Sequence, residues 1–219
     1  MPKVIVDLSM SLDGFVAGPN PTLDEPLGEH GDDLHEWAFG AVSWRESHGH
    51  SGGEDNADSK VIEESVARTG AFVMGRRMFS GGEGSWEDDP RATGWWGDEP
   101  PFHVPVFVLT RHAREPLNMQ GGTTFTFVTE GVEAALDQAR NAAGEKDVTL
   151  AGGASIAQQY LKAGLVDELQ IHVAPVFLGG GVRLFESLGD DRPELEVTRV
   201  VDSPTVTHLR YRVQKGART

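Results

Sequence analysis

Short apolar runs alternate with amphipathic segments along most of this chain, and no other feature of the sequence restricts the fold as strongly. Apolar runs between turn residues are typical of buried strands, whereas apolar residues spaced three and four apart predict helices. The predicted strands are residues 4–8, 71–74, 106–109, 124–128, 148–151, 169–176, 196–201 and 207–213, and the predicted helices are residues 32–42, 59–67, 132–143 and 155–163. The alternation indicates an α/β fold with a largely parallel sheet. The last three strands follow one another without a helix, which indicates a final antiparallel section.

The length of 219 residues suits one domain with a sizeable core, and we expect residues 1–219 to form a single domain. Two loop-rich insertions interrupt it, near residues 20–58 and 81–104, where Gly, Pro and acidic residues accumulate. Gly70 is expected to end the helix over residues 59–67, because glycine is common just after a helix.

Acidic residues are concentrated in two parts of the chain. The 34 acids and 19 bases give a formal net charge of −15, but residues 1–60 hold 12 acids and 3 bases and residues 81–100 hold 6 acids and 1 base. A strongly acidic protein repels phosphate backbones and anionic lipids, so we expect neither a nucleic-acid nor a membrane partner. No apolar segment is long enough to span a membrane, and the absence of cysteine excludes disulfides, thiolate metal sites and a cysteine nucleophile. These features together predict a cytoplasmic protein.

The strongest local motif is the predicted strand over residues 148–151 followed by Gly152, Gly153, Ala154 and Ser155, where a helix begins. Glycine lets the backbone approach a ligand closely, and the start of a helix offers free N–H groups and a partial positive charge. Together these features form an anion site that suits a pyrophosphate. The alternative is a tight turn between a strand and a helix, with no ligand.

Cationic side chains follow two further predicted strands. The residues concerned are Gly75, Arg76 and Arg77 after one strand, and Thr110 and Arg111 after the other. Arginine grips phosphate bidentately and keeps its charge, and ligands of open α/β sheets bind at the carboxyl ends of the strands. The pattern therefore predicts a phosphate site beside the glycine motif. The alternative is that the arginine pair offsets nearby acids such as Glu83 or Glu87.

Several motifs, taken in chain order, carry a family resemblance. They are residues 11–17, 74–77, 106–111, 151–155 and 165–169, with residues 174–181 after the last of them. With these motifs the chain resembles the dihydrofolate-reductase-like superfamily, and within it the reductase domain of the riboflavin-biosynthesis deaminase–reductase and its stand-alone relatives. The resemblance covers nearly the whole chain apart from the acidic insertions. It implies a three-layer α/β fold with a mixed, mainly parallel central sheet and flanking helices.

The resemblance also implies NADPH as the hydride donor. The residues it assigns to the cofactor are Gly152, Gly153, Ala154 and Ser155 for the pyrophosphate, Gly75, Arg76, Arg77, Thr110 and Arg111 for the adenosine 2′-phosphate, and Val16 and Ala17 for the nicotinamide. Folate reductases usually carry a threonine where this chain has Met78 and a tyrosine where it has Ala157, which disfavours a true dihydrofolate reductase.

A hydride transfer to a C=N bond also needs a proton. Folate reductases supply it from an acid on their first helix, and Asp33 is the nearest match in this chain. Trp37 and Leu34 are expected to surround this carboxyl group and to raise its pKa by desolvation. The alternative is that Asp32 or Asp33 caps the helix that follows.

Histidine and tryptophan gather in the two insertions. The first contains His30, His35, His48 and His50, in flexible spacing that fixes no ligand geometry, so we expect a solvated loop and no metal site. The second contains Trp86, Trp95 and Trp96, which form either a lid over a planar heterocycle or an anchor of the loop to the core or to a second subunit.

We therefore expect an NADPH-dependent reductase similar to the 5-amino-6-(5-phosphoribosylamino)uracil reductases, acting on a small heterocyclic or C=N-containing substrate. The acidic insertions favour a neutral or cationic substrate over a phosphorylated one. The alternatives are a true dihydrofolate reductase and, in another class, a nucleotide-binding module without efficient turnover. The family commonly forms homodimers, and the apolar residues 171–177 are the expected interface.

Overall fold

The computed structural model describes residues 2–82, 84–186, 188–189 and 193–214. Its strands are β1 (Val4–Ser11), β2 (Phe15–Ala17), β3 (Thr69–Gly75), β4 (Pro105–Leu109), β5 (Leu117–Asn118), β6 (Thr124–Val128), β7 (Asp147–Gly152), β8 (Glu168–Ala174), β9 (Val182–Arg183), β10 (Glu194–Asp202) and β11 (Thr207–Gln214). Its helices are α1 (Glu36–Phe39), α2 (Val42–Ser47), α3 (Ala57–Arg68), α4 (Arg76–Ser80), α5 (Val132–Ala143) and α6 (Ala154–Lys162), with short 3-10 turns η1 (Gly31–Leu34) and η2 (Gln120–Gly122).

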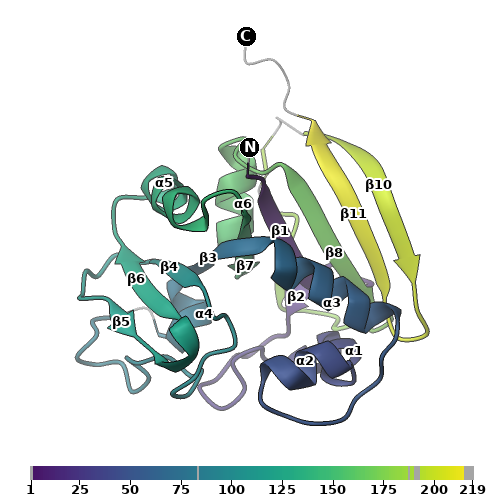
Figure 1. Ribbon diagram of the computed structural model, residues 1–219, viewed down its shortest axis with the longest axis horizontal. Helices are drawn as coiled ribbons and strands as arrows, with labels where there is room; N and C mark the ends of the chain where they lie inside the picture. The colour runs from purple at the N-terminus through teal and green to yellow at the C-terminus, as the bar shows by residue number, and fades with distance from the viewer. Residues whose placement is uncertain (1, 83, 187, 190–192, 215–219) are drawn as a thin grey trace.

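A nine-stranded sheet in the order β10-β11-β8-β1-β7-β3-β4-β6-β5 runs through the described part of the chain (Figure 1). The strands from β8 to β6 pair in parallel, whereas β11 pairs antiparallel with β8, β10 with β11, and β5 with β6. The expected mixed, mainly parallel sheet with an antiparallel C-terminal section is confirmed. The short strands β2 and β9 pair separately beside it.

The two faces of the sheet are covered differently, which gives the three expected layers. On one face α5 packs its apolar side onto β3, β4 and β7, and α6 packs onto β7 and β3; Leu136, Ile156 and Tyr160 lie in this core. On the other face α3 crosses the sheet beside α1 and α2 (Figure 1). The neighbouring area over β3, β4 and β6 is filled by Phe79 of α4 together with Trp86 and Trp96. Both tryptophans therefore anchor the second insertion to the core.

The first insertion differs from the prediction. The expected helix over residues 32–42 is divided into η1, α1 and α2. Gly40 ends α1, and the backbone of Ala41 is extended so that it bridges to Glu54.

Gly70 does not end a helix as expected, because α3 already ends at Arg68 and Gly70 lies inside β3. A Cβ at Gly70 would lie 2.8 Å from the carbonyl oxygen of Ala143, so the close approach of α5 explains this glycine.

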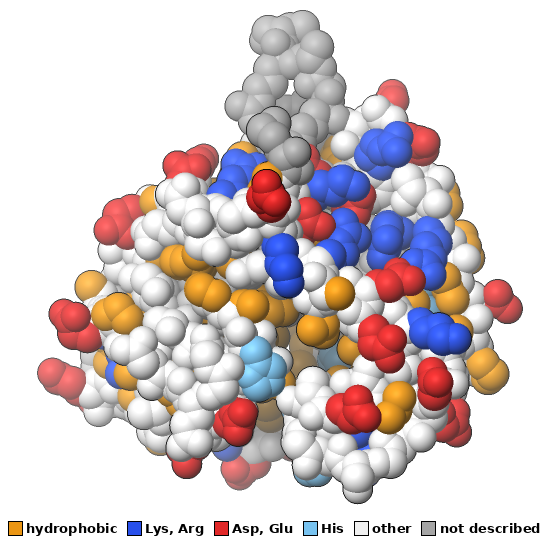
Figure 2. Space-filling view, viewed as in Figure 1, with side chains coloured by type: hydrophobic (Ala, Val, Ile, Leu, Met, Phe, Trp, Pro, Cys, Tyr) orange, Lys and Arg blue, Asp and Glu red, His pale blue; other side chains and the backbone are white. Residues whose placement is uncertain are grey.

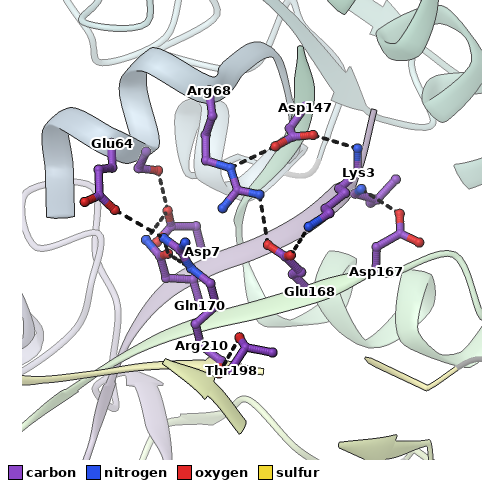
Figure 3. Close-up of polar contacts among 12 residues, drawn as sticks. Lys3, Asp7, Glu64, Arg68, Asp147, Asp167, Glu168, Gln170, Thr198 and Arg210 are labelled. Atoms are coloured by element: carbon purple, nitrogen blue, oxygen red, sulfur yellow. Dashed lines mark hydrogen bonds and ion pairs between the residues drawn. The ribbon is translucent and has the colours of Figure 1, made fainter. Parts of the chain in front are cut away.

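Ion pairs join the beginnings of three strands to the end of α3 (Figure 3). Arg68 donates to Asp147 of β7 at 2.8 Å and to Glu168 of β8 at 2.9 Å. Lys3, just before β1, donates its backbone N–H to Asp147 at 2.7 Å and pairs through its side chain with Glu168. Burial alone would raise the pKa of Glu168, but its bonds to Lys3 and Arg68 outweigh burial and lower the pKa.

Among the described residues, no helix is long and apolar enough to cross a membrane.

Replacement of Arg68 by glutamine is expected to lower the free energy of unfolding by about 2 kcal/mol, between the values for exposed and fully buried ion pairs. Its side chain is only 23% exposed, and its loss leaves two partly buried carboxylates short of a partner. Urea unfolding of Arg68→Gln measures the change. The control is Arg212→Gln, which removes an ion pair whose side chains are 59% and 48% exposed. Equal effects of the two substitutions would contradict the role given to Arg68.

Candidate functional site

The carboxyl ends of β7, β3 and β4 lie side by side and bring the predicted cofactor residues together. In the sheet register, Met74 of β3 pairs with Gly152 of β7, and Gly75 pairs with Leu109 of β4. The segments that follow these positions are Gly152 to Ser155, Gly75 to Arg77, and Thr110 with Arg111. A Cβ at Gly75 would lie 3.9 Å from the backbone nitrogen of Gly153, so two of the segments touch. The three sequence motifs thus lie next to one another at the carboxyl ends of β7, β3 and β4.

The turn from β7 into α6 has the properties of an anion site. Gly153 is the N-cap of α6, and no side chain caps this end of the helix. The space above Gly153 is open, since a Cβ there would meet no atom of the described chain within 4 Å. Gly152 has a φ of 129°, and a Cβ there would lie 2.8 Å from the sulfur of Met78. The peptide bond between the two glycines is cis. Backbone N–H groups at this end can therefore receive a pyrophosphate.

The arginines at this edge are in different environments. Arg77 and Arg111 are exposed, and the hydroxyl of Thr110 accepts a hydrogen bond from the N–H of His112 at 3.1 Å. Arg76 is only 7% exposed and forms an ion pair with Asp89, whose side chain is 2% exposed. The sequence alternative of an arginine that offsets a nearby acid thus describes Arg76. Its partner is Asp89, whereas Glu87 is exposed and Glu83 lies outside the described residues.

The two residues expected at the nicotinamide lie in β2. Val16 is 9% exposed and belongs to the apolar core that also contains Leu150 and Ile156. The carbonyl oxygen of Ala17 faces Gly181, where a Cβ would lie 2.1 Å away, so only glycine fits at that position. These contacts hold β2 beside the carboxyl end of β1, close in the chain to the turn at Gly14.

Asp33 lies in η1, and its surroundings differ from those expected. Leu34 and Trp37 turn into the core, whereas the side chain of Asp33 is 44% exposed and lies 3.6 Å from the ring of His30. No side chain caps η1 or α1, so the alternative role of Asp32 or Asp33 as a helix cap is wrong. The residues around Asp33 line an open cavity of about 200 Å³, and its acidic lining residues are Glu25, Asp32 and Asp33.

A buried polar chain under α3 was not predicted from the sequence. Nδ1 of His172 and Nδ1 of His208 are 2.6 Å apart on the paired strands β8 and β11. Nε2 of His172 contacts Asp7 at 2.7 Å, and Nε2 of His208 contacts Asp58 at 3.0 Å. The indole ring of Trp37 packs against both imidazoles and donates to Ser9 at 3.1 Å. The available signal is the alternation of Glu168, Gln170 and His172 with apolar residues along β8.

The two imidazoles and their carboxylate partners form a continuous buried network. The two Nδ1 atoms lie within hydrogen-bond distance of each other, and each Nε2 lies within hydrogen-bond distance of a carboxylate. Burial lowers the pKa of His208 despite its bond to Asp58. Burial alone would raise the pKa of Asp7, but the charge and hydrogen bond of His172 outweigh it and lower that pKa.

A family model identifies the family of this chain, and solved structures share its fold. The family model for the RibD C-terminal domain matches residues 2–209. A structure from Shewanella sp. PV-4 assigned to riboflavin biosynthesis is 22% identical with a TM-score of 0.63, and the match covers 97% of this chain and 99% of that one. RibD of Acinetobacter baumannii is 17% identical with a TM-score of 0.57, and the match covers 98% of this chain and 58% of that one.

Two further matches extend the comparison. The riboflavin biosynthesis reductase Rib7 of Saccharomyces cerevisiae is 14% identical with a TM-score of 0.52, over 97% of this chain and 88% of that one. The uncharacterized protein YwjB of Bacillus subtilis (strain 168) is 35% identical over 66 residues, which is 30% of this chain. The chain thus spans 37% of the length of this curated relative. At these identities the solved structures show a shared fold.

The pKa of His208, lowered by burial, makes stability depend on pH. When the pH falls below 6.5, the ordinary pKa of histidine, the unfolded chain binds a proton at His208 that the folded protein does not bind. The unfolded state is thereby favoured, and the free energy of unfolding decreases as the pH falls. We expect the melting temperature to decrease from about pH 7.5 to about pH 5.5, and less steeply in His208→Gln. Some slope remains, since burial also lowers the pKa of His35 and His48. His50→Gln, at an exposed site, is the control, and an unchanged slope in His208→Gln would contradict this account.

Proposed function

The chain belongs to the RibD C-terminal domain family, and we propose that it is an NADPH-dependent reductase that transfers a hydride to a small heterocyclic or C=N-containing substrate. One observation carries the proposal: the open glycine turn at the uncapped start of α6 lies beside two strand ends that bear cationic side chains. Riboflavin-biosynthesis reductases share this fold, which supports pyrimidine-reductase chemistry as the nearest named reaction.

Each part of the edge has a role in this proposal. Gly152, Gly153, Ala154 and Ser155 bind the pyrophosphate through backbone N–H groups, and Gly75 leaves room beside them. Thr110, Arg77 and Arg111 face the phosphorylated end of the adenosine. The segment with Val16 and Ala17 borders the nicotinamide. The cofactor, when bound, supplies the hydride, and the protein holds donor and acceptor in contact and excludes water.

The cavity in the first insertion is the proposed source of the proton and of substrate selectivity. Asp33 is the proposed proton donor, because its carboxyl group lines this cavity and is accessible. Glu25 and Asp32 share the lining, and such a wall repels a phosphate group. Figure 2 shows that Lys and Arg gather instead over α3, β10 and β11. A neutral or cationic substrate therefore fits the cavity better than a phosphorylated one.

Fluorescence titration with NADPH, followed by assays of NADPH oxidation, tests the proposed function. We expect NADPH to bind, and a dephosphorylated pyrimidine intermediate to be reduced faster than its phosphorylated form. Asp33→Asn is expected to lower turnover while the affinity for NADPH stays unchanged. The absence of dinucleotide binding would overturn the proposal, and binding without oxidation by any pyrimidine or folate acceptor would favour a nucleotide-binding module.

Replacement of Gly153 by alanine is expected to weaken NADPH binding at least about tenfold without loss of stability, since tenfold corresponds to about 1.4 kcal/mol. The new methyl group meets no atom of the described protein but occupies the place where a pyrophosphate approaches the backbone. Titration and thermal unfolding of the same sample separate the two effects. In Gly152→Ala the methyl group meets Met78 at a φ of 129°, so this control loses stability as well. Unchanged affinity in Gly153→Ala would exclude pyrophosphate binding at this turn.

We also propose a homodimer, at a different place from the one expected. Ile171, His172 and Ala174 of the expected interface are buried in the sheet, whereas Pro175 and Phe177 are exposed. The edge strand β10 exposes a larger apolar surface: Leu195, Val197 and Val200 continue the apolar face formed by Tyr211 and Val213 of β11. An edge strand with an uncovered apolar face suits a second copy of the chain.

The double substitution Val197→Asp and Val200→Asp is expected to convert the dimer into a monomer, because it places charges on the proposed interface. Sedimentation equilibrium measures the mass of both proteins. Val66 is as exposed as Val197, at 58%, but lies on α3, so Val66→Asp is the matched control and should remain dimeric. A monomeric unmodified protein, or a dimeric double variant, would exclude this interface.

A further inference from the structure

Arg76 is enclosed by groups of the chain itself. One guanidinium nitrogen donates to the hydroxyl of Ser80 and the other to Asp89. The guanidinium carbon lies 3.6 Å from the centre of the Trp86 ring, which is a stacking distance. Ser80 and the backbone N–H of Arg91 also donate to Asp89, at 2.7 and 2.8 Å.

The carboxylate of Asp89 is charged in this arrangement. Burial alone would raise its pKa, but the bonds from Ser80, Arg91 and Arg76 outweigh burial and lower the pKa. The second insertion thus places an anion of its own on Arg76, 13 residues away in the chain. The same insertion is fixed by Trp86, which donates to the carbonyl of His112 at 2.7 Å, and by Arg114, which donates to the carbonyl of Ala92.

A cofactor phosphate could reach Arg76 only by expelling Asp89. That exchange would leave a carboxylate that is 2% exposed without its partner, which is costly, and would place it beside the phosphate. The Nε atom of Arg76 has no partner among the described residues, but one N–H cannot form the paired bonds by which arginine grips a phosphate. Arg76 therefore remains bound to Ser80 and Asp89 and is not available to bind a cofactor phosphate.

Arg111 is in the opposite situation. It follows β4 directly and is exposed, whereas Arg76 follows the neighbouring strand β3 and is buried. Both lie at the same edge as the glycine turn. A side chain that is exposed at this edge can turn toward a bound ligand without breaking a buried ion pair, and it keeps its charge at any physiological pH.

We propose that Arg111, and not Arg76, distinguishes NADPH from NADH, and that Arg76 is a positioning residue which holds the second insertion in place through Asp89. The inference rests on the proposed function for its cofactor part. Its structural part, the anchoring of residues 84–98, does not. The two parts therefore predict separate measurements.

The test compares dissociation constants for NADPH and NADH by fluorescence titration. Arg111→Gln is expected to reduce the preference for NADPH at least about tenfold by weakening NADPH binding alone. Lys162→Gln removes an exposed positive charge at the far end of α6 and should leave the preference unchanged. The double variant Arg76→Met/Asp89→Leu removes the ion pair without leaving a lone charge and should keep the preference within about threefold of the original.

Limited trypsin digestion follows the anchor independently of any cofactor. We expect faster cleavage after Arg91 in the double variant and in Asp89→Asn, which keeps the size of the side chain and serves if the double variant does not fold. A double variant or Asp89→Asn that loses the NADPH preference, together with an Arg111→Gln that keeps it, overturns the assignment. An original protein that does not distinguish the two dinucleotides overturns the part concerning Arg111. Binding of neither dinucleotide overturns the proposed function, while unchanged digestion overturns the anchor.

Discussion

The parallel pairing of β3 with both β7 and β4 is the constraint on which the candidate site depends. In a parallel sheet all carboxyl ends meet at one edge, so residues far apart in the chain arrive there together. The pairings Met74 with Gly152 and Gly75 with Leu109 determine which residues these are. A shift of either register by one residue would turn the side chains of a whole strand to the opposite face. The apolar packing of α5 and α6 on one face and of Phe79 on the other prevents such a shift.

The face of the sheet under α3 is held by polar contacts as well as by apolar packing. Asp7, Gln170, His172 and His208 point to this face from three adjacent strands, and each has a partner. Buried polar groups add little net stability when satisfied and cost much when left without a partner. Such a network therefore selects one arrangement of α3 over the strands. The ion pairs of Arg68 at the other end of α3 act in the same way (Figure 3).

Regular elements were predictable from the sequence where one physical pattern decided them. The strand over residues 124–128 and the helix over residues 132–143 have the predicted bounds, because an apolar period of two or of 3.6 fixes both the element and its buried face. Contacts between elements were not predictable in this way. His172 and His208 face one another only in the observed register of β8 and β11, and Asp89 reaches Arg76 through a loop that has no period. The glycine and arginine motifs were placed correctly at one edge, but only the fold shows that Arg76 is enclosed.

The acidic residues that give the chain its net charge of −15 are of two kinds: some are buried and paired inside the protein, and others face solvent. Asp58 and Asp89 belong to the two acidic insertions, yet both are buried against a cationic or proton-donating partner. Asp58 is bound to His208 and Asp89 to Arg76 inside the protein, so both carboxylates exert little field outside it. Glu25, Asp32 and Asp33 in the same insertions line an open cavity, so their charge reaches whatever enters it. Because the buried acids are already paired, the proposed selection of a substrate by its charge depends on these three accessible carboxylates. In the same proposal the cofactor phosphate is bound by Arg111, which is exposed after β4 and is not part of the cavity lining.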